Sequence, residues 1–180
     1  MVQEIACIFN YKPKNLHMKR SATANWKGSG KEGSGKLLTQ SGVIKNKAYD
    51  YSSRFEDGSL TNPEELIAAA HAGCYSMKLS FVLGAAGFTP SRIETKATVS
   101  LEGGVITGSH LEVRAKVPKL KAKDFPQYAE EAKDTCPVGK ALSINVTLDA
   151  QLVKSFKAQE AGGDSESDSA DTEEGGGEEQ

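Results

Sequence analysis

Two cysteines and a cation supply the reactive chemistry that this sequence offers. Cys74 lies within a long apolar run, and Cys136 lies 62 residues later, directly before Pro137. The thiolate is the nucleophile, and a free cysteine with a pKa of about 8.5 is only about 3% thiolate at pH 7. Burial reduces that fraction further, so a reactive Cys74 needs a cation beside it. Two thiols and a nearby cation are the parts of a two-cysteine redox centre.

Arg54 and His71 are the candidates for that cation. Arg54 is always charged, and its guanidinium can form two parallel hydrogen bonds. His71 precedes Cys74 by three residues, which places both on one face of a helix. Glu64 precedes Cys74 by ten residues, or about 15 Å along a helix, so the two cannot touch within one helix. Glu64 therefore stabilises a helix start, holds Arg54 in a bidentate pair, or meets Cys74 of a second chain.

Other uses of these residues remain open. Cys74 can be an inert packed thiol, and Cys136 can be a turn residue. His71 and Cys74 have a spacing compatible with zinc, but three histidines and no Cys-x-x-Cys pair argue against a metal site. The sequence contains no Gly-rich nucleotide loop, no serine-nucleophile elbow, and no basic and aromatic stripe. We therefore expect no cofactor, no metal and no nucleic-acid partner.

The elements that must position these residues can be predicted from local signals. Asn62 and Pro63 are typical of a helix start, with Glu65 completing a capping box, and this helix extends to about Ala86. The remaining spacing predicts strands over 20–26, 36–39, 49–55 (which carries Arg54), 93–101, 108–117 and 144–152. The pair Gly103–Gly104 predicts that the strands over 93–101 and 108–117 form a hairpin. A second helix is expected to be capped by Asp124 and to end at Cys136, before Pro137, and a short helix through 142 follows. This order predicts an α+β fold with mostly antiparallel strands.

The helix expected after Asn62 is apolar on nearly all sides. Its apolar stretch is short of about 20 residues and includes His71 and Lys78, so we interpret it as a buried helix and expect no membrane span. Small side chains permit another backbone to approach closely, and they are Ala68, Ala69, Ala70, Ala72 and Gly73. A domain of this size has few layers to cover such a helix, which favours a dimer partner.

Charge and composition divide the chain into three parts. Residues 160–180 hold nine of the 24 acidic residues and no Lys or Arg, so we expect 158–180 to be an acidic, disordered tail. All 22 basic residues precede Ala158, so the domain over 18–157 is mildly basic. Residues 1–17 are expected to be an extension without a signal-peptide pattern, which leaves Cys7 outside the functional unit. Three cysteines without a secretory signal indicate a cytoplasmic protein.

The segments around the candidate residues resemble the OsmC branch of the OsmC/Ohr peroxidases. The similar segments are 24–28, 54–56, 61–67, 69–74 and 136–138, and the resemblance extends from about 18 to 153. It implies an intertwined α+β homodimer with antiparallel sheets wrapped around long central helices and active sites at the interface. It further implies that Cys74 is the peroxidatic thiol, Cys136 the resolving thiol, Arg54 the activator and Glu64 its partner.

The same resemblance implies a cysteine-based peroxidase that reduces organic hydroperoxides to alcohols. In the implied reaction, the peroxide oxidises Cys74 to a sulfenate, which then forms a disulfide with Cys136. An external dithiol such as a lipoyl group reduces this disulfide. The expected partners are a second copy of the chain, the hydroperoxide and the dithiol. The alternative is a non-catalytic module of the same fold that binds an apolar ligand at the dimer interface, with both cysteines merely packed.

Overall fold

A computed structural model describes residues 18–156 of the chain. The expectations for residues 1–17, including Cys7, and for the tail over 158–180 lie outside the described residues. The described part confirms the α+β class, with two three-stranded sheets and four helices. Its elements are β1 (Ala22–Lys27), β2 (Ser34–Thr39), β3 (Lys47–Asp50), α1 (Ser52–Phe55), α2 (Pro63–Ala85), β4 (Arg92–Glu102), β5 (Val105–Lys116), α3 (Phe125–Thr135), α4 (Pro137–Leu142) and β6 (Asn145–Leu152).

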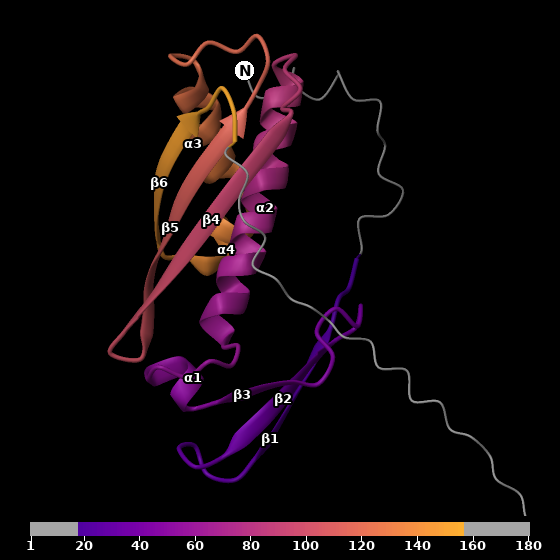
Figure 1. The fold of residues 1–180 in the computed structure, drawn as a ribbon, viewed down its shortest axis with the longest axis vertical. Helices are drawn as coiled ribbons and strands as arrows, with labels where there is room; N and C mark the ends of the chain where they lie inside the picture. The colour runs from indigo at the N-terminus through magenta and orange to yellow at the C-terminus, as the bar shows by residue number, and fades with distance from the viewer. Residues whose placement is uncertain (1–17, 157–180) are drawn as a thin grey trace, which may run out of the picture.

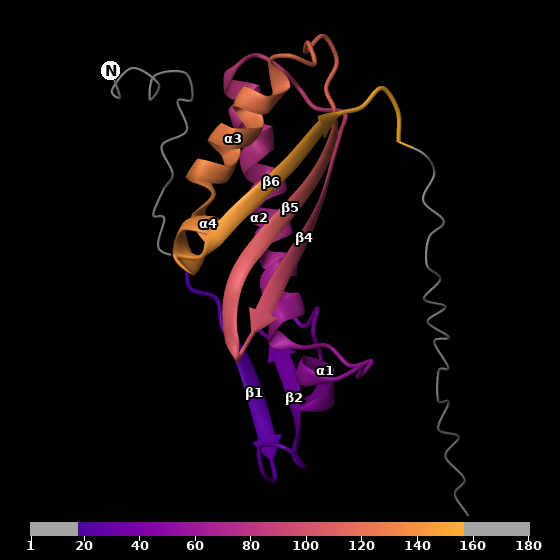
Figure 2. The same cartoon turned by 90° about the vertical axis from the view of Figure 1, so that its left-hand side faces the viewer.

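The core lies between the β4–β5–β6 sheet and the helices α2 and α3. Both helices cover one face of this sheet, and Figure 2 looks onto the opposite face (Figures 1 and 2). Strand residues alternate between the two faces, so every second side chain of β5 enters the core. The fully or almost fully buried side chains of the core include Tyr75, Leu79, Leu83, Leu111, Val113, Phe125 and Cys136.

The second sheet, β1–β2–β3, is antiparallel throughout and lies beyond the N-terminal end of α2 (Figure 1). All six residues of β1 are exposed. This sheet therefore extends away from the core of the chain that carries it.

The β4–β5–β6 sheet differs in one respect from the antiparallel sheets that we expected. β4 and β5 form the predicted hairpin, in which Gly103 and Gly104 turn the chain with φ of 58° and 81°. β6, however, pairs with β5 in the parallel direction. A parallel neighbour needs a crossover of about a dozen residues or more, and α3 and α4 supply it.

The strand expected over 49–55 ends earlier, at Asp50, and Arg54 lies on α1. The Asp50 carboxylate accepts hydrogen bonds from the Ser53 N–H at 2.8 Å and the Ser52 hydroxyl at 3.1 Å. The Ser53 hydroxyl donates to the Asp50 carbonyl at 2.9 Å. Such local side-chain bonds compete with sheet pairing and start a helical turn. The strand prediction for this segment was therefore wrong.

The start of α2 confirms the predicted cap and corrects one detail of it. Asn62 Oδ1 accepts a hydrogen bond from the Glu65 N–H at 2.8 Å, and Pro63 is the first helical residue. The Glu65 carboxylate does not close a capping box, because it accepts from the Thr61 hydroxyl at 2.7 Å. The Asn62 amide also donates to the Ser53 carbonyl at 2.9 Å. Asn62 thus ties α1 to α2.

We also expected the side chain of Asp124 to cap α3, and this prediction was wrong. Asp124 stands at the cap position, but its side chain makes no capping hydrogen bond and its backbone is helical, with φ of −94° and ψ of −18°. A capping side chain normally needs an extended backbone at that position, as Asn62 has.

We expect Asn62→Ala to lower the free energy of unfolding by about 1 kcal/mol, because the first turn of α2 loses its cap. Asn62→Asp is the matched control, since it keeps the capping oxygen and removes only the amide that reaches Ser53. Urea unfolding followed by circular dichroism measures both. Equal midpoints for Asn62→Ala and the unchanged protein would contradict the stabilising role of this cap.

α2 is by length and composition able to span a membrane, and 28% of its apolar stretch is buried inside the described structure. Its polar side chains instead pair with other elements of the fold. His71 bonds to Ser109 on β5, and Ser76 bonds to Thr95 on β4 at 2.8 Å. These contacts fix α2 as the central helix of the domain, with part of its apolar surface still uncovered.

Candidate thiol site

The structure brings Cys74 and Cys136 together across 62 residues of sequence. Cys74 is half-buried near the middle of α2, and Cys136 is fully buried at the junction of α3 and α4. Cys74 packs against the buried cluster that includes Cys136, it is close enough to raise the pKa of the Cys136 thiol, and neither cysteine forms a disulfide among the described residues. The predicted helix end before Pro137 places Cys136 there, because the residue before proline leaves the helical conformation.

The surroundings of Cys136 favour its neutral form. Burial raises the pKa of the Cys136 thiol, and contact with Cys74 raises it further. The backbone N–H groups of Gly139 and Val138 act in the opposite direction, but burial is the larger effect. Cys136 is therefore held as a thiol in this structure.

Arg54 and Glu64 form the bidentate pair that we considered. Arg54 Nη2 lies 2.5 Å from Glu64 Oε1, and Arg54 Nε lies 3.2 Å from Glu64 Oε2. The hydrogen bonds to Arg54 hold the pKa of the Glu64 carboxyl below its usual value and raise that of Arg54. Glu64, and not Glu65, is the partner, because the Glu65 carboxylate bonds to Thr61.

The Arg54–Glu64 pair does not lie beside the thiols within one chain. Glu64 is in the first turn of α2, ten residues before Cys74, which corresponds to about 15 Å along the helix axis. The single chain therefore contains two separate groups of candidate residues, a thiol pair in mid-helix and an ion pair at the helix start.

His71 is fully buried and differs from the cation that we considered at this position. Its Nδ1 lies 2.8 Å from the Ser109 hydroxyl, which is also buried. Burial lowers the pKa of His71, so its imidazole is neutral near pH 7. Ser109 was not singled out from the sequence, although its alternation with Leu111 and Val113 places all three on the inward face of β5.

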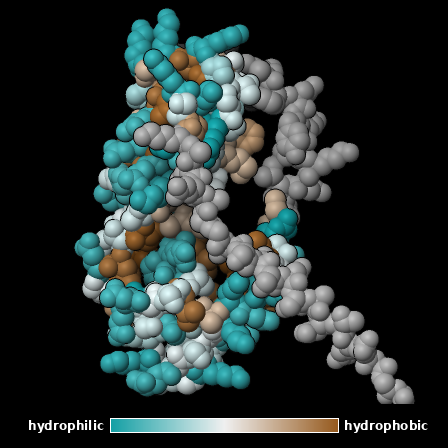
Figure 3. Space-filling view, viewed as in Figure 1, coloured by the Kyte–Doolittle hydropathy of each residue, from teal (hydrophilic) through white to brown (hydrophobic). Residues whose placement is uncertain are grey.

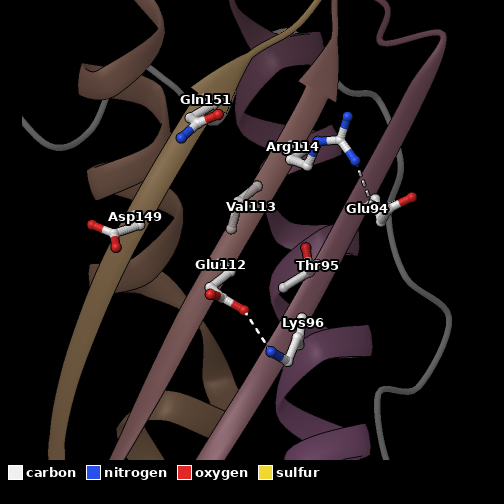
Figure 4. A pocket seen from close by; sticks show the side chains of 8 residues that line it. All are labelled: Glu94, Thr95, Lys96, Glu112, Val113, Arg114, Asp149 and Gln151. Atoms are coloured by element: carbon white, nitrogen blue, oxygen red, sulfur yellow. Dashed lines mark hydrogen bonds and ion pairs between the residues drawn. The ribbon is translucent and has the colours of Figure 1, made fainter. Parts of the chain in front are cut away.

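One pocket borders the ion pair, and another lies apart from both groups of candidate residues. One, of about 230 Å³, lies beside Arg54 and has a largely aromatic lining that includes Trp26, Tyr49, Tyr51 and Phe55. The other, of about 600 Å³, lies on the outer face of the β4–β5–β6 sheet (Figure 4). Its charges are paired across strands, Lys96 with Glu112 and Arg114 with Glu94.

Within residues 18–156, no group of three or more His, Cys, Asp or Glu is arranged to hold a metal ion.

Fold and site together define an α+β protein whose central helix carries a cysteine in contact with a second, buried cysteine. The chain belongs to the OsmC-like protein family, whose sequence profile matches residues 56–151. It is 45% identical to the peroxiredoxin OsmC of Escherichia coli over 76% of this chain and 99% of that protein.

More distant relatives and the fold agree with this family. The chain is 33% identical to an organic hydroperoxide resistance protein-like 1 of Staphylococcus epidermidis, over 54% of this chain and 74% of that protein. The crystal structure of an OsmC-like protein from Mycoplasma pneumoniae has the same fold, with a TM-score of 0.60 and 13% identity over 77% of this chain and 99% of that one.

Proposed function

We propose that this protein is a cysteine-based peroxidase that reduces organic hydroperoxides to alcohols. The observation that carries the proposal is the contact between the Cys74 and Cys136 thiols, in a family whose relatives include a protein named as a peroxiredoxin. Relatives named for organic hydroperoxide resistance support the substrate class.

We propose that the two thiols act in three steps, which are oxidation of Cys74, disulfide formation and reduction of the disulfide. The Cys74 thiolate attacks one peroxide oxygen, the O–O bond breaks, and the alcohol leaves after taking up a proton. The resulting sulfenic acid on Cys74 condenses with the Cys136 thiol, which forms a disulfide and releases water. An external dithiol, such as a lipoyl group, then reduces the disulfide. A disulfide that must be reduced in every turnover suits a reducing compartment, so we propose a cytoplasmic location.

The active site that we propose is completed by a second copy of the chain. Glu64 lies about 15 Å from Cys74 along α2 of its own chain, and Arg54 is paired with Glu64, so a partner chain would have to bring the ion pair to the thiol. α2 exposes apolar side chains that a partner helix could cover, with Met77 and Phe81 exposed by 60% and 62%. Figure 3 shows apolar surface gathered around the middle of the face along which α2 runs. Together with the extended β1–β2–β3 sheet, this favours a homodimer.

Arg54 has the chemistry to activate Cys74 in such a dimer. Its guanidinium would stabilise the thiolate and the negative charge that develops on the leaving oxygen. Glu64 would orient the guanidinium through the two hydrogen bonds already present in one chain. The aromatic pocket beside Arg54 would accept the organic group of the hydroperoxide.

This proposal predicts faster reduction of cumene hydroperoxide than of hydrogen peroxide. Burial of the cumyl group in an apolar site is expected to contribute about 2 kcal/mol, or about 30-fold in rate. The measurement is the second-order rate of each peroxide's consumption, with dihydrolipoamide as the reductant. Equal rates for the two peroxides would contradict the proposed preference for organic hydroperoxides. If neither peroxide is consumed, the protein is not a peroxidase, and the alternative of a non-catalytic module that binds an apolar ligand is favoured.

A further inference from the structure

His71 carries a buried polar atom that has no role in the two-thiol chemistry proposed above. The residue is fully buried, and its Nε2 has no hydrogen-bond partner among residues 18–156. Its other nitrogen, Nδ1, is held by the Ser109 hydroxyl at 2.8 Å. An unpartnered buried nitrogen costs free energy, and proteins retain such atoms where they have a role.

The free nitrogen faces the same small space as Cys136. A Cβ atom added at Gly139 would lie 3.2 Å from His71 Nε2 and 3.6 Å from Cys136 Cβ. Because glycine has no side chain, nothing of residue 139 separates the imidazole from the cysteine. On α2, His71 also precedes Cys74 by one helical turn. The imidazole therefore borders the space beside Cys136 and lies on the same face of α2 as Cys74.

The other titratable groups around Cys136 are already engaged. Tyr75 donates its hydroxyl to the Ala129 carbonyl at 3.1 Å, and burial raises its pKa, so it remains protonated. Glu130 on α3 is paired with Lys133 at 2.5 Å. Cys74 is the reaction partner itself. His71 Nε2, in contrast, is a buried atom without a hydrogen-bond partner among the described residues.

We propose that His71 Nε2 accepts the proton of the Cys136 thiol when the Cys74–Cys136 disulfide forms. This inference rests on the proposed function, which supplies the sulfenic acid on Cys74. In the step, a bond forms between the two sulfur atoms and the S–O bond of the sulfenic acid breaks. The thiol proton moves to Nε2 and then to the departing hydroxide, which leaves as water. The imidazole ends neutral, as it began.

Ser109 gives the imidazole the tautomer that this step needs. If the Ser109 hydroxyl accepts from Nδ1–H, the lone pair of the ring lies on Nε2. Burial favours the neutral imidazole and also keeps Cys136 protonated, so a base is needed and one is present. Ser109 therefore acts as a positioning residue for His71.

Rapid mixing with one equivalent of cumene hydroperoxide tests the inference. Sulfenic acid on Cys74 is trapped and counted by mass, and disulfide formation is timed separately in the full chain. In His71→Asn, an amide can still bond to Ser109, but no atom replaces Nε2. We expect sulfenic acid to form within about 2-fold of the original rate and the disulfide to form about 100-fold more slowly. Ser109→Ala should show a smaller slowing of the second step alone.

Alkaline pH should rescue the variant. Below the thiol pKa, each pH unit raises the thiolate fraction about 10-fold, so the rate of disulfide formation in His71→Asn should rise accordingly. The unchanged protein should show a shallower rise. A purely structural loss at position 71 would differ in the first step, because it would also slow the formation of sulfenic acid on Cys74 at every pH.

His110→Asn is the matched control, because His110 also bonds to a hydroxyl, that of Thr147 at 2.7 Å, but lies on the outer sheet face. It should leave both steps within about 2-fold. His71→Gln offers a second variant if His71→Asn does not fold, since its amide reaches the Nε2 position but does not take up a proton. Disulfide formation at the original rate in either folded variant would overturn the inference alone. Absence of both sulfenic acid and the Cys74–Cys136 disulfide in the unchanged protein after peroxide treatment would overturn the proposed function and the inference together.

Discussion

Cys74→Ser is expected to reduce the rate of organic hydroperoxide reduction by about 10³-fold or more, because the hydroxyl cannot replace the thiolate nucleophile. Cys74 lies half-buried on α2, and serine is slightly smaller, so the fold should persist. The measurement is the second-order consumption of cumene hydroperoxide, with circular dichroism to verify folding. Cys7→Ser is the matched control and should retain the original rate. A folded Cys74→Ser protein with more than a tenth of the original rate would contradict the role of this thiol.

Arg54→Lys is expected to slow the same reaction by about 100-fold. Lysine keeps the positive charge but loses the planar fork, through which Nε and Nη2 of Arg54 bind the two oxygens of Glu64. The rate of Cys74 oxidation should fall before any effect on disulfide formation. Arg92→Lys is the matched control, because Arg92 forms an exposed ion pair with Glu94 at 2.8 Å on the other sheet. An unchanged rate in Arg54→Lys would show that the thiol does not depend on the guanidinium.

If the chain forms the homodimer that we propose, mixed dimers test whether Arg54 acts on the thiol of the partner chain. When Cys74→Ser and Arg54→Lys chains are refolded together, about half of the dimers contain one chain of each kind. If Arg54 acts across the interface, one site in each mixed dimer has both Cys74 and Arg54. About a quarter of the original activity should then return. If Arg54 acts within its own chain, mixing should restore none.

Local signals explain how much of the fold could be predicted. Asn62 with Pro63, the pair Gly103–Gly104, and Cys136 with Pro137 each change the backbone over a few residues, and all three mark element boundaries in the structure. The strand expected to reach residue 55 failed because the side chain of Asp50 starts a turn that alternation does not reveal. The parallel direction of β6 depends on how α3 and α4 cross the sheet, which is a tertiary property.

The candidate site, like the fold, could be predicted where local chemistry decides and could not be predicted where tertiary packing decides. Chemistry identified Cys74, Cys136, Arg54 and Glu64 as candidates, and the bidentate pair could be anticipated from side-chain geometry alone. The contact between two thiols 62 residues apart could not, because the packing of α2 against α3 and α4 creates it. His71 was considered as a cation, but the burial that makes it neutral comes from β5 and α4. Composition does not show such burial.

The most direct test of the two-thiol mechanism is the mass of the protein after one equivalent of an organic hydroperoxide. We predict that the intact chain loses the mass of two hydrogen atoms and that peptide mapping finds Cys74 linked to Cys136. The same link should disappear on treatment with dihydrolipoamide. A stable added oxygen on Cys74, with Cys136 still a free thiol after the peroxide is consumed, would contradict it.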